Sequence, residues 1–241
     1  MFNGIRVKII KFIIDINERI FFEKRLHNYY KKNINIETVI DVGANKGQSI
    51  DFFLRLNEDC KIYAIEPNPK LYNLLVEKYK GNKNIQIFNL GISDHSGEKL
   101  FFENVFDYTS SFEELNYDSK YLEKKAKILG IEKENIISNK YPVSVKTLQD
   151  IIKENNIVEN IDVIKIDTEG HEYYCLQGLF KDKEVNNIQY IQLENHNDDM
   201  YASKISFSQI ESYLLENKFK NCMNIKHGFG DFSEVIFKKM N

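Results

Sequence analysis

From Thr38 onward, the pattern of apolar and polar positions switches between two periods. Short runs rich in β-branched and aromatic residues alternate with longer segments whose apolar residues recur every three or four positions. The short runs are typical of strands and the longer segments of helices. Strands that alternate with helices build a parallel sheet covered on both faces, so the pattern predicts an α/β fold. The predicted strands are Thr38–Val42, Lys61–Ile65, Ile85–Asn89, Ile161–Ile166 and Ile188–Leu193, with helices near 47–57, 69–80, 147–155, 170–179 and 207–216.

The pattern changes at both ends of this alternation. Two last β-type runs, Phe219–Asn224 and Glu234–Lys238, flank a loop with two glycines and predict a hairpin that places one antiparallel strand in the sheet. Residues 5–30 carry apolar side chains at helical spacing with charged residues between them. We expect an N-terminal helical extension over residues 1–35, before a domain over 36–241. The extension could pack on that domain, pair two copies as a homodimer, or lie on a membrane surface.

The segment 104–142 interrupts the alternation. It is rich in Ser, Asn, Glu and Lys and contains one helical candidate, Asp118–Leu129. A long polar segment between core elements is more often functional than a plain connection. We therefore predict that it is an inserted lid.

Composition narrows the class of protein. The chain has 241 residues, 42% of them hydrophobic, which suits one large globular domain. A net charge of −3 gives no broad positive field, so we expect no nucleic-acid partner. Three cysteines far apart fit neither a disulfide framework nor a zinc site, and they favour a reducing, cytoplasmic location. No apolar run reaches the roughly 18 residues of a membrane span, so we expect no integral membrane segment.

The first two strand ends suggest an adenosine-type cofactor. In open α/β sheets, ligands bind at the carboxyl ends of strands. The first strand runs into a turn with two glycines, Gly43 and Gly47, and the second ends at Glu66, 23 residues after Gly43. A carboxylate at that spacing can accept hydrogen bonds from both ribose hydroxyls. Asn45 replaces the second glycine of a dinucleotide turn, and Asp41 would repel a pyrophosphate, so the turn favours the cationic S-adenosylmethionine over NAD or FAD.

The next strand ends carry candidate catalytic residues. Asp167 and His171 follow one strand, and Glu194 and His196 follow its neighbour. If S-adenosylmethionine gives its methyl group to a hydroxyl, that hydroxyl must be positioned and its proton removed. We expect Asp167 in the active site, His196 as the base and Glu194 as its partner. Asp167, Glu194 and Asn195 could instead bind a divalent metal that activates the hydroxyl, and the sequence leaves both mechanisms open.

Five motifs resemble those of the FkbM-type S-adenosylmethionine-dependent O-methyltransferases, and the resemblance covers about residues 36–240. The resemblance implies a class I methyltransferase (Rossmann-like) fold with a mostly parallel seven-stranded sheet. The matching segments are Val39–Gln48, Ile65–Pro67, Gly91–Asp94, Ser110–Ser111 and Ile164–Glu172.

The same resemblance implies roles for single residues and a class of substrate. Glu66 would hold the ribose, and Ser93 with Asp94 would lie beside the adenine. The acceptor would be a sugar hydroxyl, as in a nucleotide-sugar used for surface polysaccharide biosynthesis. A nicotinamide-dependent sugar oxidoreductase and a non-catalytic cofactor-binding protein are the alternatives. The residues that would surround the rest of the cofactor are Asp41, Gly43, Ala44, Asn45, Gly47 and Gln48.

Overall fold

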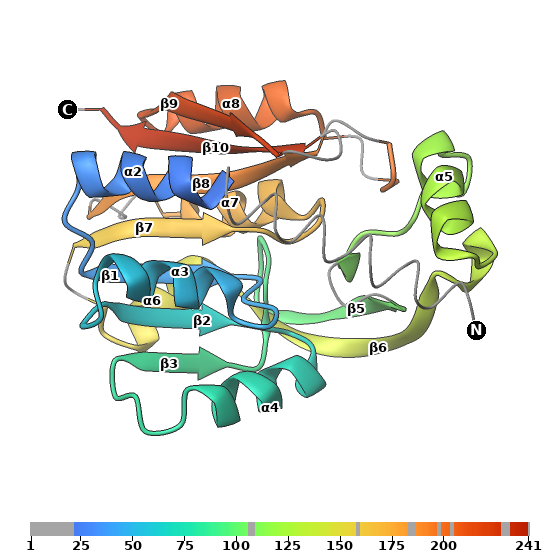
Figure 1. The fold of residues 1–241 in the computed structure, drawn as a ribbon, viewed down its shortest axis with the longest axis horizontal. Helices are drawn as coiled ribbons and strands as arrows, with labels where there is room; N and C mark the ends of the chain where they lie inside the picture. Colours follow the sequence, from blue (N-terminus) through green and yellow to red (C-terminus); the bar gives the residue numbers. More distant parts are fainter. Residues whose placement is uncertain are drawn as a thin grey trace.

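A seven-stranded sheet forms the centre of the molecule (Figure 1). The computed structural model describes residues 22–105, 109–157, 160–182, 187–196, 199–202, 205–227 and 232–240. The strand order is β3-β2-β1-β7-β8-β10-β9. These strands are β1 (Thr38–Val42), β2 (Lys61–Ile65), β3 (Ile85–Phe88), β7 (Ile161–Ile166), β8 (Ile188–His196), β9 (Phe219–Lys226) and β10 (Phe232–Lys239).

The topology confirms the predicted fold class. Strands β3, β2, β1, β7 and β8 run parallel, and β10 lies antiparallel between β8 and β9. The chain builds outward from β1 in one direction through β2 and β3, and then in the other direction from β7. The carboxyl ends of β1 and β7 therefore meet where the direction of winding changes, which is where ligands bind in open α/β sheets.

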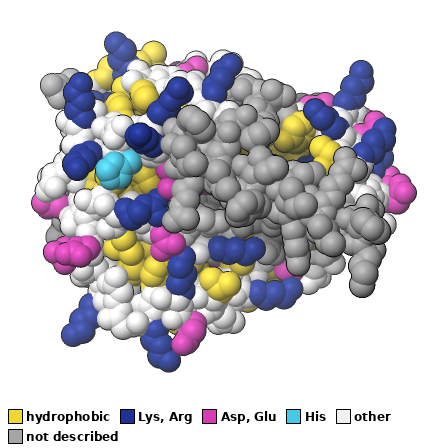
Figure 2. Space-filling view, in the orientation of Figure 1, with side chains coloured by type: hydrophobic (Ala, Val, Ile, Leu, Met, Phe, Trp, Pro, Cys, Tyr) yellow, Lys and Arg dark blue, Asp and Glu magenta, His cyan; other side chains and the backbone are white. Residues whose placement is uncertain are grey.

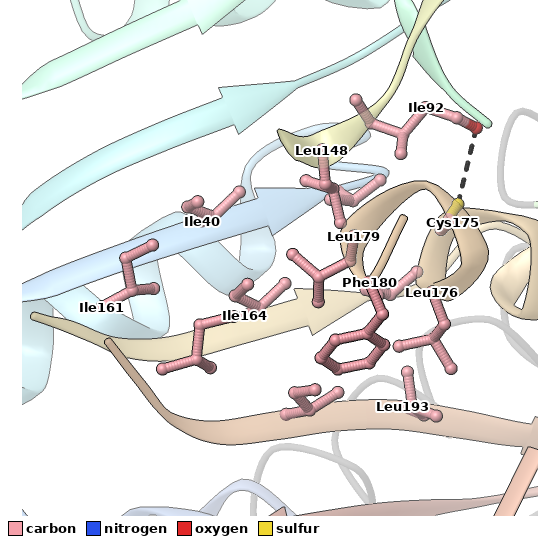
Figure 3. Packing of buried hydrophobic residues seen from close by; sticks show 14 of the residues in the cluster. Ile40, Ile92, Leu148, Ile161, Ile164, Cys175, Leu176, Leu179, Phe180 and Leu193 are labelled. Carbon is pink, nitrogen blue, oxygen red and sulfur yellow. Dashed lines mark hydrogen bonds between the residues drawn. The ribbon is translucent and has the colours of Figure 1, made fainter. Parts of the chain in front are cut away.

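Helices cover both faces of this sheet. Helices α2 (Glu23–Asn33), α3 (Gln48–Leu56) and α4 (Pro69–Lys78) pack on one face, and Figure 1 shows α2 and α3 in front of the strands. Helices α6 (Leu148–Glu154), α7 (Glu172–Leu179) and α8 (Phe207–Glu216) pack on the other. Figure 3 shows this second core, where Leu176, Leu179 and Phe180 lie against Ile164 of β7. Both faces of the central strands are buried, which explains their nearly continuous apolar sequences.

The start of the chain is described only from Phe22. Helix α2 lies within the predicted extension and buries Leu26 and Tyr30 against the sheet, where the Tyr30 hydroxyl donates to Gln192 Oε1 at 2.6 Å. The rest of the predicted amphipathic helix, residues 5–21, lies outside the described residues. Within the described part of the chain, each helix is too short or too polar to cross a bilayer.

The segment 104–142 contains more regular structure than its sequence predicted. Helix α5 (Lys120–Leu129) confirms the helical candidate, with Ser119 capping its first turn. Strands β4 (Gly91–Ile92), β5 (Gly97–Asn104) and β6 (Ile137–Lys146) form a second sheet, in the order β4-β6-β5, which we did not predict. The second half of β6 does alternate, since Tyr141, Val143 and Val145 are apolar and turned inward. The alternation is short and contains a proline, which argues against a strand in a sequence.

Charged side chains are mixed on the face of the molecule that Figure 2 shows. Lysines and arginines are interspersed there with Asp and Glu over the coloured part of the surface. This distribution agrees with the small net charge of −3.

Candidate functional site

The loops that follow β1 and β7 are in direct contact. The Asp167 amide donates to Val42 O at 3.0 Å, and a Cβ added to Gly43 would lie 1.9 Å from Asp167 O. Gly43 also has a φ of 85°, which side chains rarely adopt. Only glycine fits here, and the two strand ends are therefore brought together as the sequence predicted.

The turn after β1 has the conformation of a glycine-rich loop although it contains Asn45. Gly43, Asn45 and Gly47 all have positive φ values, and Asn45 has a φ of 49°. Asparagine adopts this left-handed conformation more readily than most residues do. The turn ends at Gln48, the first residue of α3, so the backbone amides at the amino end of that helix lie beside the turn.

Glu66 lies beside this turn, as predicted. Its side chain accepts from the Asn45 amide at Oε2 and from the Asn68 amide at Oε1, both at 2.8 Å. Glu66 is only 4% exposed. The carboxylate thereby fixes the turn after β1 to the end of β2, and its contact with a ribose stays a prediction.

Asp41, the last polar residue before the turn, is a buried acceptor. It is fully buried, and Ser49 donates to its Oδ2. Its Oδ1 has no hydrogen-bond partner among the described residues. Burial raises the pKa of Asp41, against the effects of the Lys165 ammonium and the Ser49 hydroxyl. A buried oxygen that lacks a donor suits a cationic or hydrogen-bonding ligand.

Lys165 is a functional candidate that we missed in the sequence. Its Nζ donates to Asp167 Oδ2 at 2.8 Å, and its side chain is 11% exposed. Burial acts to lower the pKa of Lys165, but the carboxylates of Asp167, Asp41 and Glu234 outweigh it and raise that pKa. The ammonium therefore stays charged among acidic groups. A lysine inside the apolar strand Ile161–Ile166 was the signal that could have revealed it.

Glu194, a predicted site residue, lies in a second group of largely buried polar side chains. We did not predict the rest of this group from the sequence. Glu194 faces Glu234 across β8 and β10, and Gln192 Nε2 donates to Glu234 Oε2 at 3.0 Å. His227 Nε2 lies 3.9 Å from Glu194 Oε1. Burial raises the pKa of Glu234 to about 7; Lys165 opposes this, and the carboxylates of Glu194 and Asp167 add to it.

Among the residues that the structure describes, two sets of acidic and histidine side chains have ligand atoms within 4.8 Å of one another, as binding of a metal ion requires. One contains Asp167, Glu169 and Glu194, and the other contains Glu194, His227 and Glu234. The structure groups Asp167 with Glu194, as the metal alternative requires. Asn195 follows Glu194 in β8, and neighbouring residues of a strand point to opposite faces, so its role as a third ligand stays a prediction that this geometry disfavours.

His171, a candidate base, is fully buried. Its Nε2 lies 3.0 Å from Ser93 Oγ, and its Nδ1 lies 2.7 Å from Glu113 Oε1. Ser93 donates in turn to Asp94 Oδ1 at 2.9 Å, so His171 contacts the predicted adenine turn rather than open solvent. His196 is the last residue of β8, and its role as base stays a prediction.

Comparison with solved structures supports the fold. An S-adenosylmethionine-dependent methyltransferase from Aquifex aeolicus superposes with a TM-score of 0.51, over 98% of each chain and at 14% sequence identity. At this identity the likeness shows a shared fold and nothing finer. The class I methyltransferase fold predicted from the sequence is thereby confirmed.

Comparison of sequences gives the family. The methyltransferase sdnD of Sordaria araneosa is 28% identical over 157 residues, which are 58% of this chain and 60% of that protein. The chain thus matches less than two thirds of that relative's length. The model of the methyltransferase FkbM domain matches residues 41–221, which run from the buried Asp41 through the turn, Glu66 and the Asp167 loop to β9. On this match over most of its length, the chain belongs to the FkbM methyltransferase family.

Proposed function

We propose that the protein is an S-adenosylmethionine-dependent O-methyltransferase. The observation that carries this proposal is the buried Asp41 carboxylate, which lies beside a left-handed turn and Glu66 and has one oxygen without a donor from the described part of the chain. This set of groups fits a ligand with an ammonium group and a ribose better than a pyrophosphate. Asp41 and the turn would hold the amino-acid part of the cofactor, Glu66 the ribose, and Ser93 with Asp94 the adenine.

The chain's own residues would position the acceptor and take its proton. When bound, the cofactor supplies a methyl group already activated by a sulfonium. Asp167 is the carboxylate best placed to accept the hydroxyl proton, because it follows β7 beside the turn and its side chain is 30% exposed. The Lys165 ammonium donates to Asp167 Oδ2, which holds the carboxylate in place. His196 with Glu194 is the alternative base.

The finer proposal concerns the acceptor. We propose a sugar hydroxyl, as on a nucleotide-sugar used for surface polysaccharide, with the protein acting in the cytoplasm. Its support is the family resemblance together with the acidic groups around Asp167 and Glu194, which suit a ligand with several hydroxyls.

Calorimetry tests the cofactor. S-adenosylmethionine and its demethylated product should bind to the intact protein, whereas NADH, followed by fluorescence, should not. Binding of NADH without binding of either methionine derivative would favour the oxidoreductase. Binding of the methionine derivatives without turnover of any acceptor would favour a non-catalytic protein.

A mass-spectrometric screen of nucleotide-sugars tests the acceptor. Incubation with S-adenosylmethionine should add the mass of one methylene to one of them.

Asp167→Asn should lower turnover by about 10²–10⁴-fold, and His196→Ala by the same amount if His196 is the base. Full activity in EDTA would remove the metal alternative at the Asp167 and Glu194 sets. Loss of activity in EDTA and recovery with magnesium would favour it.

A further inference from the structure

A row of hydrogen-bonded side chains runs from the predicted lid to the turn after β4. Glu113 bonds His171, His171 bonds Ser93, and Ser93 bonds Asp94, at 2.7, 3.0 and 2.9 Å. His171 and Ser93 are fully buried, and the Glu113 side chain is 15% exposed. The bonds are therefore largely shielded from water. They join three parts of the chain that are far apart in sequence.

Each contact of this row uses a different atom. Ser93 donates to Asp94 Oδ1, Ser93 Oγ lies beside His171 Nε2, and His171 Nδ1 lies beside Glu113 Oε1. Both ring nitrogens of His171 therefore have a partner, and the ring links the predicted lid to the turn that carries Asp94.

The His171 ring is also held from its sides. It stacks on Tyr174 with a centroid distance of 4.7 Å, and Phe112 lies 5.3 Å away. Phe112 is itself fixed, because a Cβ added to Gly91 would lie 2.3 Å from its ring. With both nitrogens bonded and its faces covered, His171 is placed to hold its neighbours in position.

We infer that His171 and Glu113 are positioning residues for recognition of the adenine ring. The row fixes Asp94 through its Oδ1, which also contacts His95 Nδ1 at 2.7 Å. Asp94 Oδ2 is then directed to accept a hydrogen bond from the adenine amino group. The Asp94 side chain is 39% exposed, so a ligand can reach it. This inference rests on the proposed function, because it requires an adenosine-type cofactor at Ser93 and Asp94.

The test compares two ligands that differ in the amino group alone. Calorimetry measures S-adenosylhomocysteine and its analogue with purine in place of adenine. The parent protein should prefer the amino-bearing ligand by at least about tenfold, the size of one hydrogen bond to a charged group. Glu113→Ala should reduce this preference to about twofold or less. Glu113→Gln should be intermediate, because its amide oxygen still accepts from His171 Nδ1.

The neighbouring residue provides a matched control. Glu114 is exposed, so Glu114→Ala should keep the parent's preference. If the parent protein binds neither ligand, the proposed function fails. If the parent binds both ligands equally, or if Glu113→Ala keeps the preference, the positioning role is wrong.

Discussion

At the scale of single residues, the site is organised around a buried cation. Lys165 lies on the sheet face covered by α2 and α3, together with Asp41, Gln192 and Glu234. Three carboxylates act on its ammonium. Because buried charges are costly unless they are paired, Lys165 allows several acidic groups to gather at one strand end.

Replacement of Lys165 by a neutral residue should destabilise the folded protein. Lys165→Met leaves the carboxylates of Asp167 and Asp41 without their counter-charge, so we expect a loss of about 3 kcal/mol in the free energy of unfolding. Urea denaturation measures it. Lys127→Met is the control, because Lys127 pairs with Glu123 on the exposed surface of α5, and its denaturation midpoint should hardly change. Equal midpoints for the two variants would show that Lys165 is not a buried counter-charge.

Glu66 should affect ligand binding more than folding. Glu66→Ala removes the acceptor for the Asn45 and Asn68 amides and the predicted ribose contact. We expect binding of S-adenosylhomocysteine to weaken by about 1.5–3 kcal/mol, with a smaller loss for Glu66→Gln. Calorimetry measures both, and Glu58→Ala on the exposed surface is the control. Unchanged affinity in both Glu66 variants would disprove the ribose assignment.

At the scale of elements, the sequence predicted the strands best where burial on both faces produces a continuous apolar run. Strands β1, β2 and β7 begin and end as predicted, since buried parallel strands are nearly continuous apolar runs. Strands β5 and β6 were missed because the apolar alternation in β6 is short and contains Pro142, and because the pairing of the two strands leaves no local pattern.

The residues of the candidate site differ in the same way in how well the sequence predicts them. Asp41 lies near the end of β1, and Glu66 and Asp167 directly follow β2 and β7, so their positions at the strand ends could be predicted from the sequence. Glu113 and Glu234 come from a loop and from an antiparallel strand, so only the tertiary fold brings them to the site.

This difference refines what we expect of the predicted lid. Strands β5 and β6 are paired along their length, so their amides should be protected from hydrogen exchange without any ligand. Protection in α5 and in residues 109–119 should rise when cofactor and acceptor are both bound. Exchange measured by mass spectrometry separates these segments. Equal protection of α5 with and without ligands would identify a static subdomain.

At the scale of the whole molecule, stability should depend on pH through Glu234. Its pKa rises from 4.5 in the unfolded chain to about 7 in the fold, so the folded state holds the proton more tightly. The stabilisation is fully present below pH 4.5 and is lost as pH rises toward 7. Glu234→Gln mimics the protonated form and should gain up to about 3 kcal/mol relative to the parent across that range.

Denaturation curves at several pH values measure this difference. Glu98→Gln, at an exposed position, should follow the parent at every pH. A constant difference between Glu234→Gln and the parent would contradict the predicted titration.

The register of the small sheet has a consequence for protein engineering. Asn104 at the end of β5 pairs with Ile137 at the start of β6, so the chain leaves and re-enters the domain at neighbouring positions. The residues between them form an insertion whose two ends lie close together. A tight hairpin could replace this insertion without stretching the backbone on either side. The same two positions would serve as splice points for chimaeras, in which this insertion is exchanged between related methyltransferases. Glu113 lies within it and contacts His171, so an exchanged segment should keep that glutamate.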